Sequence, residues 1–152
     1  PVYAFGVTIR LVLVCSGIGA LFSGARGITH RRLFGAILSL AVCHIVVWRL
    51  AVALRSEVLF GVDVVVIALL AVGMGMPFPR TVQRVRAAAP RLVPWLWGIN
   101  GYVSVLAVLA AGLIGLSWGL SALAGLGTIC YAVAMLTFPP VLPPEAAAPG
   151  RP

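Results

Sequence analysis

Residues 92–144 read LVPWLWGINGYVSVLAVLAAGLIGLSWGLSALAGLGTICYAVAMLTFPPVLPP and contain no charged side chain. As a single α-helix this run would be about 80 Å long, whereas the hydrocarbon core of a bilayer is about 30 Å thick. The run therefore predicts two membrane crossings, at 93–116 and 120–138, joined by a turn near residues 117–119.

Three further apolar stretches precede this run, and each is long enough to cross a bilayer once. They occupy residues 2–23, 33–54 and 58–76. With about five predicted crossings, the expected fold class is all-α, a polytopic transmembrane helix bundle comprising residues 1–138. Residues 139–152, six of which are Pro, are predicted to form an irregular cytoplasmic tail.

The composition excludes a water-soluble enzyme. The 152 residues are 62% hydrophobic and 9% charged, whereas soluble domains have about 25% charged residues. The sequence contains no nucleophile–base pair, metal-ligand spacing or phosphate-binding loop, so we expect no catalytic activity and no cofactor. Three cysteines lie inside apolar runs and are expected to be buried without a disulfide or a metal, namely Cys15, Cys43 and Cys130.

Arginines predict the orientation of the chain. The loops after the first and third crossings hold seven arginines and lie on the same side of the membrane. Because cytoplasmic loops carry excess Lys and Arg, we expect the N-terminus outside and the C-terminus inside. We therefore attribute the formal net charge of +8 to arginines that orient the chain and contact lipid headgroups, rather than to nucleic-acid binding.

The longer basic loop carries Arg80, Arg84, Arg86 and Arg91. These arginines serve either as topology determinants alone or as ligands for lipid phosphates or an acidic partner.

Small residues recur along one face of the crossing at 93–116. Such a stripe allows helix backbones to approach closely in lipid. It predicts packing within the chain or, alternatively, a docking face for a partner. Asn100, next to the stripe, is expected to bond across helices, and Trp95, Trp97 and Trp118 are expected to anchor the two ends of the crossing at the membrane interfaces. The stripe consists of Gly98, Gly101, Ser104, Ala107, Ala111 and Gly115.

Few polar residues interrupt the apolar runs, and intramembrane ionisable groups are often functional. The orientation above places Arg10 and Asp63 in the same outer third of the bilayer, where they could pair. Alternatively, Arg10 extends to the interface and Asp63 lies at the membrane surface. His44, in the middle of a crossing, is either a hydrogen-bonded core residue or the ligand of a haem or chlorophyll.

Three segments together resemble one protein family. They are GMPFPR at 75–80, VPWLWGING at 93–101 and SVL at 104–106. Their order and spacing resemble the membrane domain of bacterial fused spermidine-synthase-like proteins, and residues 1–21 resemble the helix that follows the G-H-P turn of that family. The resemblance covers residues 1–138 and implies an integral protein of a bacterial plasma (inner) membrane. It implies that these helices accompany an aminopropyltransferase-like domain, of which this sequence contains no part.

We therefore expect a non-catalytic integral membrane module or subunit that anchors or stabilises a larger membrane assembly. Its expected partners are lipids, other membrane subunits, or a cytoplasmic domain at the arginine-rich face. Two alternatives remain open. One is a transporter-like domain that moves a small solute, and the other is a cofactor-carrying subunit of an electron-transfer or light-harvesting complex. Because the sequence begins with Pro1, we also expect a processed or partial polypeptide.

Overall fold

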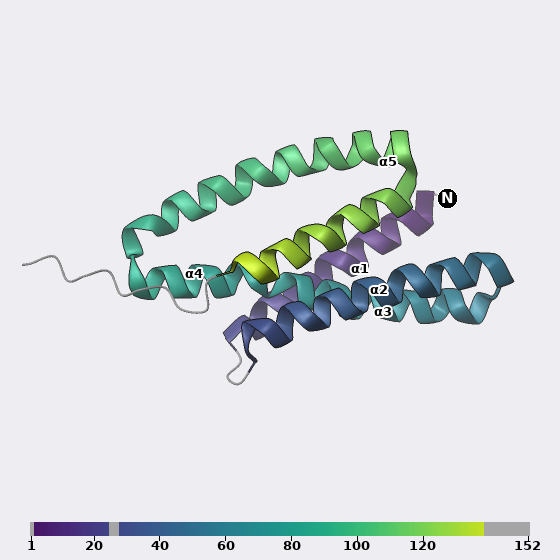
Figure 1. Cartoon of the computed structure of the whole chain (residues 1–152), viewed down its shortest axis with the longest axis horizontal. Coiled ribbons are helices and arrows are strands. Elements are labelled where there is room, and N and C mark those ends of the chain that lie inside the picture. Colours follow the sequence, from purple (N-terminus) through teal and green to yellow (C-terminus); the bar gives the residue numbers. More distant parts are fainter. Residues whose placement is uncertain (1, 25–27, 139–152) are drawn as a thin grey trace, which may run out of the picture.

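The computed structural model describes residues 2–24 and 28–138, and all regular structure in this part of the chain is helical (Figure 1). This confirms the predicted all-α fold class. The predicted tail at 139–152 lies outside the described residues. The elements in chain order are α1 (Val2–Leu21), η1 (Phe22–Gly24), α2 (His30–Leu54), α3 (Glu57–Gly75), α4 (Pro77–Ala88), η2 (Pro90–Leu92) and α5 (Val93–Thr137).

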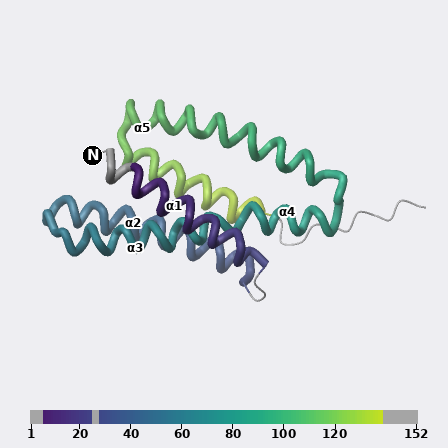
Figure 2. The backbone as a smooth tube through the Cα atoms, turned by 180° about the vertical axis from the view of Figure 1, so that it is seen from behind, coloured from purple at the N-terminus to yellow at the C-terminus, as the bar shows by residue number. Residues whose placement is uncertain are grey.

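Within the described residues, four helical stretches are long and apolar enough to cross a membrane. The last of them contains α5, which reverses its direction at Gly119 (Figures 1 and 2). Gly119 has φ 82° and ψ 168°, a backbone conformation that side-chain-bearing residues rarely adopt. The reversal lies where the sequence predicts a turn. It divides α5 into a first arm, residues 93–118, and a second arm, residues 120–137.

Helices α1 and α3 cross with their backbones in contact. A Cβ atom added to Gly19 would overlap the carbonyl oxygen of Val72, and one added to Gly75 would overlap that of Ser16. Only glycine permits this approach, which is how helices associate closely in lipid. The closest packing in the described chain therefore uses glycines outside the predicted stripe.

Helix α2 lies against α3 on one side and the second arm of α5 on the other. A tight turn joins α2 to α3, in which Arg55 adopts a left-handed conformation and the Ser56 hydroxyl accepts a hydrogen bond from the Leu59 amide. These are ordinary helix-ending and helix-starting devices. The buried apolar side chains are Leu33, Phe34, Ile37 and Ala51 of α2 and Val66 and Ala71 of α3.

The arginine-rich segment after α3 is a helix, so its prediction as a loop was wrong. Helix α3 ends at Gly75, close to the predicted end of the third crossing at residue 76, but α4 begins immediately at Pro77. Proline is tolerated in the first turn of a helix, where its missing N–H has no intrahelical acceptor. Similarly, α2 begins at His30, a few residues before the predicted start, with Thr29 as its N-cap.

The small-residue stripe packs little against the rest of the chain, contrary to the first of its two predicted roles. A Cβ added to Gly98 or Gly101 would meet nothing within 4 Å, and at Gly115 it would meet only Leu123, at 4.0 Å. Near its start the first arm does contact α4, where the Phe78 and Trp97 rings lie edge to face at 4.9 Å. Beyond this contact the stripe residues up to Ala107 are exposed.

Candidate intramembrane site

His44 of α2 and Asp63 of α3 form an ion-pair-type hydrogen bond in the interior of the bundle. His44 Nδ1 lies 2.8 Å from Asp63 Oδ1. The Asp63 side chain is 4% exposed and that of His44 is 26% exposed. A buried carboxylate without a partner is costly in free energy, so the imidazole both satisfies Asp63 and fixes its own orientation.

The structure corrects the predicted partner of Asp63. Arg10 is exposed on α1, and within the described residues the ion-pair partner of Asp63 is His44. Asp63 is also buried among the helices of the bundle. Equal depth in the bilayer made an Arg10–Asp63 pair conceivable, but depth does not determine the rotation of a helix about its axis. Of the two interpretations of His44, the hydrogen-bonded core residue agrees with this geometry.

The hydrogen bond also assigns different roles to the two imidazole nitrogens. When Nδ1–H donates to the carboxylate, the neutral ring leaves Nε2 as an acceptor. No hydrogen bond joins Nε2 to another group among the described residues. His44 therefore presents one available nitrogen inside an otherwise apolar environment.

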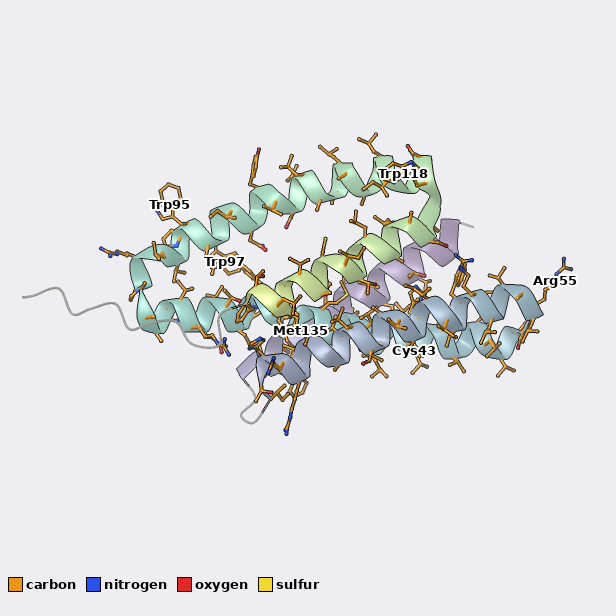
Figure 3. All side chains as sticks on the ribbon, in the orientation of Figure 1. Cys43, Arg55, Trp95, Trp97, Trp118 and Met135 are labelled. Carbon is orange, nitrogen blue, oxygen red and sulfur yellow. The ribbon has the colours of Figure 1, made fainter. Side chains whose placement is uncertain are left out.

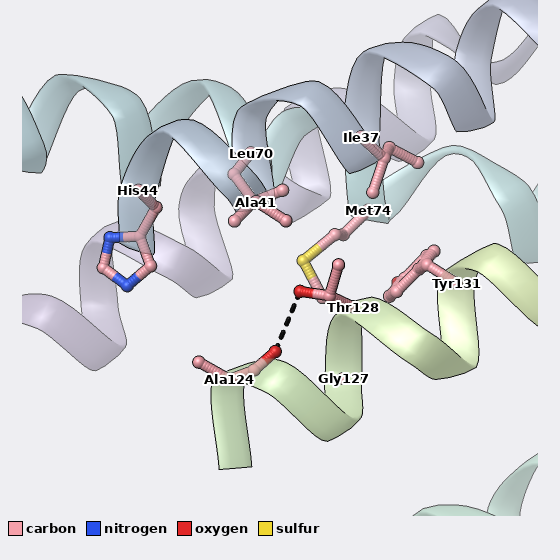
Figure 4. Close-up of a pocket in the computed structure, with 9 residues that line it drawn as sticks. All are labelled: Ile37, Ala41, His44, Leu70, Met74, Ala124, Gly127, Thr128 and Tyr131. Carbon is pink, nitrogen blue, oxygen red and sulfur yellow. Dashed lines mark hydrogen bonds between the residues drawn. The ribbon is translucent and has the colours of Figure 1, made fainter. Parts of the chain in front are cut away.

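A pocket of about 220 Å³ adjoins His44 between α2, α3 and the second arm of α5 (Figure 4). Its polar groups are few. The Thr128 hydroxyl donates to the carbonyl oxygen of Ala124 at 2.9 Å, and His44 and Tyr131 lie toward opposite ends of the pocket. The lining residues are Ile37, Ala41, His44, Leu70, Met74, Ala124, Gly127, Thr128 and Tyr131.

At the arginine-rich end of the bundle, the Arg80 side chain hydrogen-bonds to the connection between α1 and α2. Its Nε donates to the Ser23 carbonyl at 2.8 Å and its Nη1 to the Ile28 carbonyl at 3.0 Å. Gln83 adds a bond from its amide to the Ser23 hydroxyl at 3.4 Å. Helix α4 is thus hydrogen-bonded to both ends of the connection between α1 and α2. The sequence did not indicate this role.

Arg84 and His30 lie in an aromatic cluster at the same end. The Arg84 guanidinium carbon is 5.2 Å from the centre of the Phe138 ring, and the His30 ring is also 5.2 Å from it. Phe34 and Tyr131 extend the cluster along α2 and α5. Arg84 Nη1 and His30 Nε2 are buried without a hydrogen-bond partner within the described part of the chain. Arg86 is exposed.

Other predicted features are scattered rather than gathered into a site. Cys43 and Cys130 are exposed on the bundle surface, so their predicted burial was wrong, and Cys15 is half-buried. Trp95 and Trp118 lie at opposite ends of the first arm of α5 (Figure 3).

The described residues contain no cluster of three or more His, Cys, Asp or Glu side chains that could hold a metal ion. The pocket beside His44 is a candidate site because it adjoins the hydrogen-bonded His44–Asp63 pair. Protein-family models, curated proteins and solved structures show no match to this chain.

Proposed function

We propose that this protein is a non-catalytic membrane module that stabilises a larger membrane assembly, and that the first arm of α5 receives a transmembrane helix of another subunit. The observation that carries this proposal is Asn100. Its side chain is exposed on the first arm and has no hydrogen-bond partner among the described residues. An amide in contact with lipid hydrocarbon favours association with a helix that can bond to it.

The neighbouring residues suit such an association. Asn100, Ser104, Ala107 and Ala111 follow one another at steps of four, three and four, so they lie on one helix face. All but Asn100 are small, which lets a partner backbone approach closely enough to bond with the amide. Most of the face is exposed, and no residue of α5 is buried by the chain itself.

The topology is part of the proposal. We infer five crossings, with the two arms of α5 as separate ones, the N-terminus outside and the C-terminus inside, in a bacterial inner membrane. The reversal at Gly119 supports the count. Two contacts support the orientation. Arg80 joins α4 to the α1–α2 connection, and Arg84 lies over the Phe138 ring after α5. The basic side chains are thus grouped at one end of the bundle, as expected of a cytoplasmic side. Lipid phosphates would bind at this end, and the resemblance to spermidine-synthase-like membrane domains adds a cytoplasmic domain as a partner there.

The proposed association is tested with two substitutions on opposite faces of the first arm of α5. Asn100→Leu removes the amide, whereas Tyr102→Leu changes an exposed side chain about 160° away around the helix. Native membranes containing each tagged variant are extracted into polymer-bounded lipid discs, and the masses of the purified particles are measured.

We expect the native chain and Tyr102→Leu to copurify with a second membrane protein and Asn100→Leu to lose it. Recovery of the native chain as a monomer would overturn the proposal, as would equal retention of the partner by both variants. A particle that contains only copies of this chain would also contradict it, since the helix would then come from a second copy.

A further inference from the structure

We propose that the pocket beside His44 binds a small single-ring aromatic alcohol, a phenol, whose hydroxyl donates a hydrogen bond to His44 Nε2. This inference is independent of the proposed assembly role. It combines three properties of the pocket: its volume, its mainly apolar lining and the acceptor nitrogen of His44.

The volume of the pocket suits a single ring. A cavity of about 150 Å³ lined by apolar side chains is large enough to bind benzene, and the volume here is about 220 Å³. Sites for drug-sized molecules begin at about 300 Å³. The pocket therefore has room for one substituted ring but not for a macrocycle, so the prediction that His44 ligates a haem or chlorophyll gains no support from it.

The lining favours an aromatic body. Ile37, Ala41 and Leu70 contribute aliphatic walls, and Met74 contributes a thioether (Figure 4). Thioethers make favourable contacts with aromatic rings. Because the walls come from α2, α3 and the second arm of α5, a ring seated here would contact three helices at once.

The proposed position of the ligand hydroxyl follows from the hydrogen bonds of the lining residues. Thr128 already donates its proton to the Ala124 carbonyl. Asp63 holds the Nδ1 side of the His44 ring, so Nε2 remains as the acceptor at that end of the pocket. A hydrogen-bond donor on the ligand is needed to satisfy this nitrogen, and a hydroxyl on the ring supplies it without adding a charge.

The experiment observes His44 directly. The chain has two histidines, so the His30→Gln variant, labelled with ¹⁵N-histidine and placed in lipid nanodiscs, gives imidazole signals from His44 alone. Phenol and toluene are titrated separately, each with the concentration corrected for partition into the lipid. We expect phenol to shift the Nε2 resonance in a saturable manner, with an affinity about three- to tenfold above that of toluene, as one net hydrogen bond gives.

A matched pair of alanines on α2 provides the control. Ala41 lines the pocket, whereas Ala36 is exposed and does not. Ala41→Leu should fill the pocket and abolish the saturable shift, and Ala36→Leu should leave it unchanged. If Ala41→Leu fails to fold by circular dichroism, Ala124→Leu fills the same pocket from α5.

A shift that rises linearly with phenol, or that persists in the filled variant, would show partition into lipid and overturn the proposal. Equal affinities for phenol and toluene would overturn the assignment of His44 as the hydrogen-bond acceptor.

Discussion

At the scale of single residues, the pairing of His44 with Asp63 determines the electrostatics of the bundle interior. The Asp63 side chain is 4% exposed, so its carboxylate depends on the imidazole for compensation. Buried ion pairs contribute little compared with apolar replacements, but removal of one partner leaves an uncompensated charge. This asymmetry leads to a prediction about a single and a double variant.

We expect His44→Leu to lower the free energy of unfolding by about 3–5 kcal/mol, and the double variant His44→Leu/Asp63→Leu to recover most of that loss. The measurement is reversible unfolding in mixed micelles with increasing SDS, followed by circular dichroism. A double variant as unstable as the single one would mean that the pair contributes through packing rather than through charge.

Arg80 provides a second residue-scale prediction. Its guanidinium donates to the carbonyls of Ser23 and Ile28, and hydrogen bonds of charged groups contribute about 1.5–3 kcal/mol each. Arg80→Ala should therefore destabilise the protein by at least about 1.5 kcal/mol in the same unfolding assay. The control is Arg86→Ala, because Arg86 is exposed on the same helix. Equal effects of the two substitutions would show that Arg80 acts only through its positive charge.

The sequence identified the polar residues of the candidate site but not their contacts. His44 and Asp63 stand out because ionisable groups are rare in apolar runs. Their pairing depends on the rotation of α2 and α3 about their axes, which hydropathy does not encode. The pocket was missed altogether, because most of its lining residues are ordinary apolar ones that come from three helices.

At the scale of elements, two glycines determine how α1 and α3 pack. We expect Gly19→Ala to destabilise the protein by about 1–3 kcal/mol, because the added methyl group would overlap the Val72 carbonyl. Gly17→Ala, on the same helix, would meet nothing within 4 Å and should be neutral or stabilising by up to about 1 kcal/mol. Thermal unfolding in a single detergent compares the two. Equal stability of the two variants would contradict a close approach of Gly19 to the Val72 carbonyl.

The elements also show where patterns in the sequence mislead. The first arm of α5 holds the more regular series of small residues, yet the closest backbone contact uses Gly19 and Gly75. A small-residue series indicates that close approach is permitted, and it does not identify the partner helix. Likewise, the composition of α4 is that of a polar loop, but Pro77 in its first turn is compatible with a helix.

At the scale of the whole molecule, the fold class follows from composition because the surrounding lipid imposes it. Large apolar side chains are exposed along every long helix, from Leu13 on α1 to Leu136 on α5. In water such a surface would aggregate, whereas in a bilayer it contacts acyl chains. The proposed count of five crossings rests on one further feature, the positive φ of Gly119, at which α5 reverses its direction.

The topology can be tested with single cysteines in a chain whose native Cys15, Cys43 and Cys130 are replaced by Ser. Ser117 lies next to the reversal in α5 and Arg86 lies on α4, and both are exposed. The first arm, at about 1.5 Å per residue, is about 39 Å long and suffices to separate these positions by a bilayer. We expect a membrane-impermeant maleimide to label Ser117→Cys in intact cells and Arg86→Cys only after permeabilisation, because arginine-rich segments remain cytoplasmic. The opposite pattern would reverse the orientation, and labelling of both positions from one side would mean that the first arm does not cross the membrane.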